Sequence, residues 1–418
     1  MSRVVKLEEL CLPDQIGKYG IPAVAEEFSE DKVRYLRITD IDDYGNLLEN
    51  DKKSVSSPEI EKYILKEGDI VFARTGNSTG RTYFHEEKNG ELAFAGFLIK
   101  FSLDESKVNP KYLKYFTISK PYKQWVDNLS NGSTRGNINA KTFADCPIIL
   151  PSREQQDYLV RVLSSLEDKI QINNQINQEL EAMAKTLYDY WFVQFDFPDQ
   201  NGKPYKSSGG KMVYNPELKR EIPEGWGVEK LGELAQFKNG INYEKTSSGS
   251  EKVKIVNVRN ISSSTIFINQ TDLDEIFLEN DKSTNFIVNE GMILITRSGI
   301  PGATRLVSEL ESKTVYSGFI IASEVNDLIY KNLIFYYLKN VEEVLKNQSA
   351  GTIMKNISQS VLTEMTVSLP PQNVLLKFNS IIDNLLEQMK NVQRQNQELT
   401  QLRDWLLPML MNGQVKVE

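Results

Sequence analysis

The stretch of the sequence that most suggests chemistry is GDIVFARTGNSTGR, from Gly68 to Arg81. An apolar run leads into a turn rich in glycine and threonine, as in a strand followed by a phosphate-binding loop. Such a loop needs the pattern GxxxxGK[ST], because its lysine reaches the β- and γ-phosphates and its hydroxyl holds magnesium. Here the interval from Gly76 to Gly80 is one residue too short, and an arginine follows it. The stretch therefore does not predict nucleotide binding.

Two further motifs imitate catalytic ones. The dipeptide PD at 198–199 with ELK at 217–219 resembles a nuclease metal motif, but both lie in a turn-rich connector without strands to bring the carboxylates together. The tetrapeptide NPKY at 109–112 resembles the pocket motif of an adenine methyltransferase, but it lacks the second proline. No glycine-rich cofactor loop supports it. We therefore expect this chain to carry out neither cleavage nor methyl transfer.

The bulk composition sets wider limits. A single histidine (His85) and two cysteines (Cys11 and Cys146) cannot form a usual zinc site or a disulfide framework, and we expect His85 to lie in a surface loop. A length of 418 residues exceeds one ordinary core and predicts at least two domains. The net charge of −8 argues mildly against nucleic acid as a partner, although a local basic face would not change that total much.

No run of about 18 apolar residues occurs, and the start of the chain has no apolar signal-peptide core. These features predict a cytoplasmic protein without a membrane segment.

The elements that must position any functional residue are written twice. The segment VRYLRITDI (Val33 to Ile41) parallels VKIVNVRNI (Val253 to Ile261), 220 residues later, and EGDIVFARTG parallels EGMILITRSG. Further matches join AGFLI with SGFII, GSTRGNIN with GTIMKNIS, and KLEELC with KLGELA. This period is too long for a solenoid, whose units have about 20–50 residues. We therefore predict a duplicated domain in a pseudo-twofold arrangement that reads something with two halves.

Each copy is predicted to be mixed α/β. Short runs rich in β-branched and aromatic residues alternate with Gly, Asn and Ser turns, as expected of strands. One helix-like segment follows them, PKYLKYFTIS in the first copy and YKNLIFYYLKNVEEVLKN in the second. The apolar residues of the strands are expected to form the core.

A long helical segment follows each copy. The residues reached from Leu159 in alternating steps of three and four are mostly apolar, with polar residues near the centre. The positions 219 residues later, from Phe378 onward, show the same pattern. Such spacing is typical of a coiled coil, and the polar steps would fix the register in which the two helices pair. The predicted pairing residues are Leu159, Val162, Leu166, Ile176, Leu180, Met183, Leu187, Phe378, Ile381, Leu385, Val392, Leu399, Leu402 and Leu406.

An alternative is that each helix packs only on its own module, although a heptad seam is narrower than an ordinary core stripe. A helix of 32 residues is about 48 Å long, so paired helices would set a distance between two modules. The sequence then divides into a first domain, a long helix, a connector, a second domain and a second long helix, at residues 1–150, 151–195, 196–225, 226–368 and 369–418.

These features together resemble the specificity subunit of a Type I restriction–modification enzyme. The resemblance rests on the duplicated DIVFARTG-like modules, the connector NPELKREIPEGW that leads into LGELA, and the C-terminal LRDWLLPMLMNGQV. It covers essentially the whole chain. It implies two target recognition domains, each reading one half of a bipartite DNA sequence, and two long helices that pair antiparallel.

The resemblance also implies partners. The helices would dock two methyltransferase subunits, and restriction subunits that translocate DNA would join outside them. Family members are not enzymes themselves, so S-adenosylmethionine, ATP and magnesium are expected on partner subunits, with no cofactor and no metal on this chain. Double-stranded DNA is the expected ligand. The alternatives are a self-sufficient DNA methyltransferase or nuclease, and a coiled-coil adaptor with two protein-binding modules.

Residues in the turns after the repeated strands are the candidate DNA contacts. Backbone beside Gly and Ser or Thr can approach phosphates, and arginine can bond guanine with two hydrogen bonds. The candidates are Arg74, Thr75, Arg81, Arg135 and Asn137 in the first module, and Arg297, Ser298, Arg305, Lys355 and Asn356 in the second.

Overall fold

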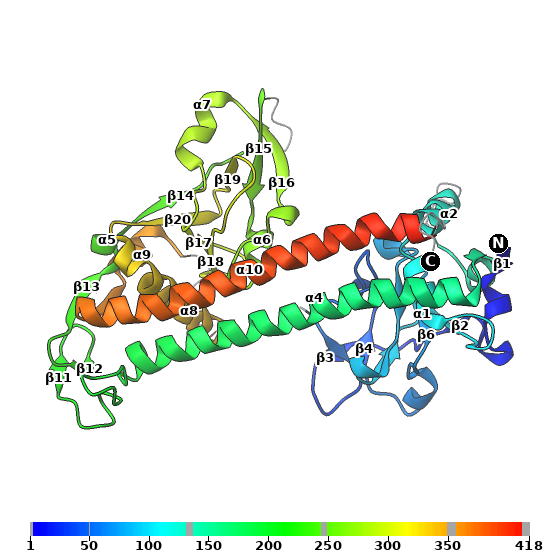
Figure 1. Ribbon diagram of the computed structural model, residues 1–418, viewed down its shortest axis with the longest axis horizontal. Coiled ribbons are helices and arrows are strands. Elements are labelled where there is room, and N and C mark those ends of the chain that lie inside the picture. Colours follow the sequence, from blue (N-terminus) through cyan, green and yellow to red (C-terminus); the bar gives the residue numbers. More distant parts are fainter. Residues whose placement is uncertain (1–2, 50, 131–136, 244–248, 349–356, 412–418) are drawn as a thin grey trace. The chain divides into compact units, whose positions relative to one another are not determined.

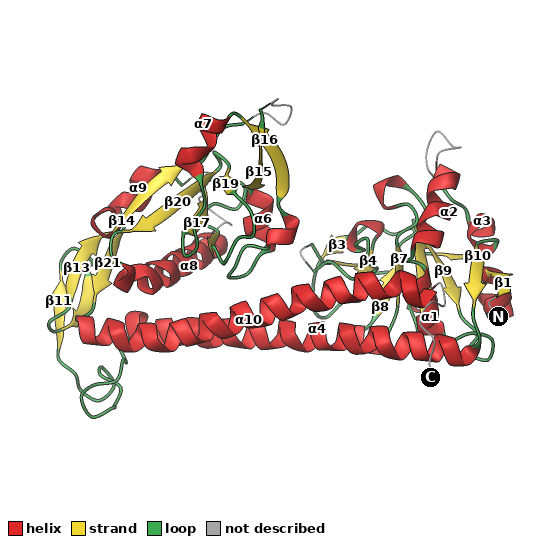
Figure 2. Cartoon of the chain, turned by 45° about the horizontal axis from the view of Figure 1, so that its top comes forward, coloured by secondary structure: helices red, strands yellow, loops and turns green. Residues whose placement is uncertain are grey.

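The computed structural model describes residues 3–49, 51–130, 137–243, 249–348 and 357–411. The chain divides into two compact units: unit 1 comprises Met1–Gln171 with Asn396–Glu418, and unit 2 comprises Ile172–Gln395. Two long helices, α4 (Arg153–Tyr188) and α10 (Gln372–Met411), each contribute to both units. Figures 1 and 2 show these helices with the strands and shorter helices labelled.

Unit 1 is built on two four-stranded sheets. One sheet has the order β2-β9-β6-β7 and is antiparallel throughout. The other has the order β3-β5-β4-β8, in which β4 and β8 run parallel. A separate antiparallel pair joins β1 to β10. The bounds are β1 Arg3–Lys6, β2 Lys18–Tyr19, β3 Glu26–Glu27, β4 Arg34–Leu36, β5 Lys53–Ser54, β6 Asp69–Ala73, β7 Thr82–Phe84, β8 Leu92–Phe94, β9 Leu98–Ser102, β10 Pro147–Leu150, α1 Pro110–Phe116, α2 Lys120–Ser130 and α3 Ala140–Ala144.

Unit 2 repeats this plan. Its four-stranded sheet has the order β14-β20-β17-β18, and its three-stranded sheet has the order β16-β15-β19 with β15 and β19 parallel. The antiparallel pair is β13 with β21. The bounds are β13 Gly227–Lys230, β14 Ala235–Asn239, β15 Glu251–Val256, β16 Asp274–Leu278, β17 Ile293–Thr296, β18 Thr304–Leu306, β19 Thr314–Tyr316, β20 Ile320–Val325, β21 Thr366–Leu369, α5 Leu231–Leu234, α6 Val258–Ser263, α7 Asn280–Ser283, α8 Lys331–Gln348 and α9 Gln359–Glu364.

The prediction of two similar mixed α/β modules is confirmed by this strand order. Each central strand is the repeated apolar run: β6 and β17 are buried along their whole length. A strand covered on both faces has no polar side to alternate with, so it reads as a continuous apolar run. The duplicated sequence thus specifies one topology twice.

The two long helices pack together and run in opposite directions (Figures 1 and 2). In unit 1, Leu159 and Leu163 of α4 share a core with Leu407 of α10. In unit 2, the Asn173 amide donates a hydrogen bond to the Gln395 side-chain oxygen at 3.3 Å. Asn173 is only 1% exposed, so a polar step of the predicted seam does join the two helices, as a device that can fix their register.

The predicted seam is correct only in part. Among its members, Leu159, Leu180, Phe378 and Leu385 are buried. Four others are exposed, namely Ile176, Met183, Ile381 and Leu402. The remaining six are half-buried, namely Val162, Leu166, Leu187, Val392, Leu399 and Leu406.

The reason for the discrepancy is that each helix also packs on the core of a unit. In unit 2 the buried apolar positions of α4 are Leu180, Ala184 and Tyr188, spaced by four, and they share one core with the strands and with α10. A helix that faces both a partner helix and a domain core buries a wider stripe than a strict heptad seam. The helices therefore pair with each other and also pack on the units, so the alternative in which each helix packs only on its own module is wrong.

The connector is more structured than its composition suggests. It contains the antiparallel hairpin of β11 (Met212–Asn215) and β12 (Arg220–Pro223). Phe195, Phe197 and Trp226 are buried in the core of unit 2, with Phe195 and Trp226 in edge-to-face contact at 5.3 Å. Aromatic burial of this kind fixes the chain on the core even where Gly and Pro are frequent.

Two local predictions are resolved by the structure. His85 is 2% exposed, so the expectation of a surface loop is wrong: it follows β7, and its amide donates to the carbonyl of Asp69 at 2.8 Å. In the NPKY segment, the Asn109 side chain caps α1 by accepting from the Lys111 amide, and Tyr112 is buried. This motif therefore begins a helix and packs it. Among the described residues, no helix is long and apolar enough to cross a membrane.

Candidate nucleic-acid interface

Arg74 and Arg297 occupy the same place in the two units. Arg74 follows β6 and Arg297 follows β17, the central strands of the matched sheets. The Arg74 carbonyl accepts from the Ile138 amide at 2.9 Å, and the Arg297 carbonyl accepts from the Ile357 amide at 3.0 Å. Both side chains are half-buried. Backbone bonds of the same kind hold both arginines at the end of a buried strand, so their positions do not depend on a loose loop.

The surroundings of the two guanidinium groups differ. The Arg74 guanidinium lies 5.1 Å from the ring centre of Tyr19, and its Nε donates to the Asn137 side-chain oxygen at 3.3 Å. In unit 2, Arg297 Nη1 donates to the carbonyl of Gly318 at 3.2 Å. None of these contacts is with a carboxylate. Both groups thus keep positive charge available for a phosphate or a base edge.

The turns after these arginines are built alike. In unit 1, the Gly80 amide donates to the Ala73 carbonyl at 2.8 Å, and Gly80 has a φ of 85°. In unit 2, the Gly302 amide donates to the Thr296 carbonyl at 2.9 Å, with a φ of 86°. A positive φ of this size favours glycine. The two glycine-rich stretches are therefore strand-end turns, which explains why they imitate a phosphate-binding loop without matching it.

Arg81 is engaged in a surface ion pair. Its Nε lies 2.7 Å from Asp43, and its Nη1 donates to the carbonyl of Ile41 at 3.0 Å. To contact DNA it would have to give up the carboxylate. Its counterpart in unit 2 is Ala303. The Ala73 amide donates to the Arg81 carbonyl, and the Thr296 amide donates to the Ala303 carbonyl in the same way.

Arg305 is removed from the candidate set, because it does not lie in a turn. It is part of β18, is 4% exposed, and forms an ion pair with the buried Glu342 at 2.9 Å. It pairs with Leu294 of β17, just as Tyr83 pairs with Val71 in unit 1. Arg305 therefore corresponds to Tyr83 and not to Arg81.

The other candidates stay as predictions or lie outside the described residues. Thr75 and Ser298 are half-buried beside the two arginines, and Asn137 is exposed. Arg135, Lys355 and Asn356 lie outside the residues that the structure describes.

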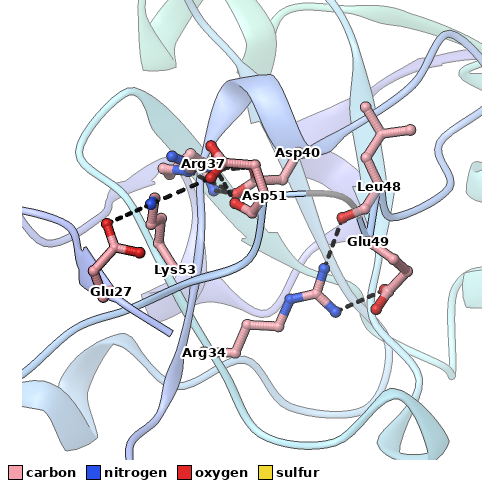
Figure 3. A network of polar contacts seen from close by, with 8 residues as sticks. All are labelled: Glu27, Arg34, Arg37, Asp40, Leu48, Glu49, Asp51 and Lys53. Carbon is pink, nitrogen blue, oxygen red and sulfur yellow. Dashed lines mark hydrogen bonds and ion pairs between the residues drawn. The ribbon is translucent and has the colours of Figure 1, made fainter. Parts of the chain in front are cut away.

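Several other basic groups of unit 1 are neutralised by nearby carboxylates, as Figure 3 shows. Arg37 Nη2 lies 2.6 Å from the buried Asp40 and 3.1 Å from Asp51. Lys53 lies between Asp51 and Glu27, at 3.2 and 2.8 Å. The hydrogen bond from Arg37 holds the pKa of Asp51 below its usual value. These arginine and lysine side chains already form ion pairs with nearby carboxylates. They are therefore poorly placed to neutralise phosphate.

Unit 2 has a counterpart of this network. The Asn257 amide donates to the Asn260 side chain, as the Arg37 amide donates to Asp40 in unit 1. Arg259 pairs with Asp272 at 3.2 Å and with Asp274 at 2.7 Å. This comparison leaves Arg74 and Arg297 as the matched pair of arginines for which no carboxylate contact is described.

Sequence reasoning missed a matched pair of exposed aromatic residues. Phe97 and Phe319 are 58% and 64% exposed, and each carbonyl accepts a hydrogen bond from the amide of Arg74 or Arg297. The repeated segments AGFLI and SGFII contained the signal. However, an apolar residue next to a strand is read as core by default.

The fold and the paired loops together define a class of protein: two copies of one mixed α/β recognition domain, each followed by a long helix. The family model for the Type I restriction modification DNA specificity domain matches residues 4–182 and 223–401. The chain therefore belongs to the specificity subunits of Type I restriction–modification systems, the non-catalytic components that recognise DNA targets within these complexes.

Similar proteins agree with this membership. The chain is 28% identical to the Type I restriction enzyme MjaIX specificity subunit of Methanocaldococcus jannaschii, over 74% of this chain and 69% of that protein. It is 22% identical to the HindI specificity subunit of Haemophilus influenzae, over 86% of this chain and 89% of that one. The crystal structure of a Type I S subunit from M. genitalium shares the fold, with a TM-score of 0.52, 15% identity, and coverage of 98% of this chain and 96% of that one.

Proposed function

We propose that each unit reads one half of a bipartite DNA target and that the strand-end loop carrying Arg74 or Arg297 faces the DNA. The observation that carries this proposal is the matched construction of the two loops. Both arginines are fixed by backbone bonds to the same neighbouring segments, and neither contacts a carboxylate in the described part of the chain. Thr75, Ser298 and Asn137 belong to the same proposed surface. Arg81 joins it only if DNA displaces Asp43.

We further propose that the long helices bind two methyltransferase subunits and that restriction subunits join the assembly. S-adenosylmethionine, ATP and magnesium then belong to those subunits. Apolar side chains on the helices that no unit covers support this proposal, and they include Ile176, Met183, Ile381, Leu402 and Trp405. Contact with a partner subunit would remove this apolar surface from water, which stabilises an interface by about 25 cal/mol per Å².

Substitution of the matched arginines tests the reading function. In the complex with its methyltransferase subunits, Arg74→Ala and Arg297→Ala should each weaken DNA binding by about 5- to 150-fold, as expected for the loss of about 1–3 kcal/mol. If the lost contact is to phosphate, the slope of log affinity against log salt should fall by about one. Titration of labelled duplex at several salt concentrations measures both quantities.

The matched control is Arg259→Ala, which removes a guanidinium that already pairs with two carboxylates. We expect it to leave affinity and salt dependence unchanged. Unaltered binding by both Arg74→Ala and Arg297→Ala would show that these loops do not face DNA.

A further inference from the structure

Phe97 and Phe319 are large apolar side chains that both units leave in solvent at the same place. They are 58% and 64% exposed, whereas the residues that follow them, Leu98 and Ile320, are completely buried. Exposure of a phenylalanine forfeits about 1.5–3 kcal/mol of burial free energy. The duplicated units differ at many positions, yet both keep this exposed ring.

The turn that presents each ring is built in the same way in both units. The Leu98 amide donates to the Ala95 carbonyl at 2.8 Å, and the Ile320 amide donates to the Ser317 carbonyl at 2.9 Å. Each turn is thus closed by a bond between residues three apart, with the phenylalanine at its tip.

A glycine that directly follows a neighbouring strand, β2 or β14, passes against each turn. A Cβ atom on Gly20 would lie 2.2 Å from the carbonyl oxygen of Ala95, and one on Gly240 would lie 2.3 Å from that of Ser317. Only glycine allows this close approach, because any larger residue would place its Cβ atom against the turn. Both units therefore have a glycine at the position that packs against the turn.

Each ring stands next to a proposed DNA-binding arginine. The Arg74 amide donates to the Phe97 carbonyl at 3.1 Å, and the Arg297 amide donates to the Phe319 carbonyl at 2.9 Å. In both units the residue that carries the cation and the residue that carries the exposed ring are thus joined through their backbones at the same sheet end. This combination suits a nucleic acid, which offers phosphates and apolar sugar and base surfaces together.

The residues that surround this pair differ between the units. Tyr19 of β2 corresponds to Asn239 of β14, since they pair with Ile99 and Ile321 respectively. The exposed turn residue after Gly76 is Asn77, whereas the one after Gly299 is Ile300. Positions at which the two units differ can explain why the two DNA half-targets have different sequences. Positions that are identical in both units, such as the arginine and the phenylalanine, cannot explain this difference. Contacts that position DNA are separate from contacts that specify its sequence.

We propose that Phe97 and Phe319 are sequence-independent apolar contacts to DNA, one in each half-target, in which the ring rests against sugar or base surface beside the phosphate held by Arg74 or Arg297. Apolar side chains act in this way when they are pressed against or between bases without reading hydrogen-bonding edges. The proposal rests on the proposed function, because it requires that this end of each unit faces DNA.

The test uses the complex with its methyltransferase subunits and the variants Phe97→Ala and Phe319→Ala. Each variant should weaken binding of the cognate duplex by about ten-fold, in keeping with the loss of about 1.4 kcal/mol of apolar burial. The slope of affinity against salt should stay unchanged, because no charge is removed. The set of methylated sequences, mapped across a genome, should also stay the same. Phe97→Leu and Phe319→Leu, which keep an apolar group, should recover part of the affinity.

Phe28→Ala is the matched control in unit 1, since Phe28 is an exposed ring at 42% exposure that lies outside the strand-end loop. It should bind DNA like the parent chain. Circular dichroism of all variants should match the parent, because the substituted rings are exposed.

Each other outcome overturns the proposal in a distinguishable way. If Arg74→Ala weakens binding while Phe97→Ala and Phe319→Ala do not, the rings make no DNA contact, but the proposed function stands. If neither kind of variant weakens binding, the proposed function fails as well. A changed base preference would show that the rings read sequence, and loss of methyltransferase subunits from the complex would show that they contact protein.

Discussion

Residue type alone does not separate a functional arginine from a structural one. Arg74 and Arg305 each stand beside a threonine and within three residues of a glycine. The structure leaves Arg74 half-buried next to Tyr19, but places Arg305 at 4% exposure against Glu342. The difference arises from position in the sheet, since Arg74 follows the end of β6 whereas Arg305 lies inside β18 and pairs with Leu294 of β17. The sequence therefore located the candidate loops but could not select their members.

The buried His85 makes a prediction about acid stability. Burial lowers the pKa of His85, and this effect outweighs the nearby Asp69, Glu67, Glu86 and Glu87, which act to raise it. The unfolded chain, with an ordinary histidine pKa of about 6.5, then binds the proton more readily than the folded one. The contribution of His85 to the free energy of unfolding is therefore fully present above about pH 6.5. It should decrease as the pH drops from about 7 toward 5.5, by at most about 1.4 kcal/mol per pH unit.

Because His85 is the only histidine in the chain, this dependence can be isolated. Urea denaturation at pH 7.5, 6.5 and 5.5 should show the decline in the parent chain but a flatter profile in His85→Gln. Equal slopes in the two proteins would indicate that His85 does not titrate between the folded and unfolded states.

At the scale of elements, the repeated strands were predictable and the helix seam was not fully so. Strands such as β6 and β17 were evident because a sheet buried on both faces needs a continuous apolar run. The seam failed at Met183, which is 58% exposed, while Ala184 next to it is completely buried. Apolar residues at alternating steps of three and four predict contact with a single partner helix. The helix α4 instead packs both on α10 and on a domain core.

Leu180 and Met183 give a matched test of this correction. Leu180 is 8% exposed in the core of unit 2, so Leu180→Asp should bury an unpaired charge and lower stability by about 3 kcal/mol or more. Met183→Asp, three residues along the same helix, should change stability by less than about 0.5 kcal/mol. Urea unfolding followed by circular dichroism compares them.

The same pair separates folding from assembly. If the exposed helix face binds a methyltransferase subunit, Met183→Asp should reduce recovery of that subunit on affinity purification while the chain stays folded. Full recovery with Met183→Asp would remove this position from the proposed contact. A large loss of stability would contradict the corrected seam.

At the scale of the whole molecule, duplication was the most reliable signal in the sequence. It appeared in short matches such as AGFLI with SGFII and was confirmed by two four-stranded sheets of equivalent strand order. The sequence did not predict that each long helix belongs to both units. A local pattern of apolar residues does not show which distant segment completes a core. The same limit hid the packing of the connector on unit 2.

The central claim is that the two units read two half-targets independently. The most direct measurement is methylome mapping in cells whose complex carries this chain with residues 1–150 replaced by the matching segment of a relative of different specificity. The account predicts a new first half-sequence and an unchanged second one, since unit 2 retains its own strands and loops. Altered methylation in both half-sequences, from a complex that still assembles, would contradict it.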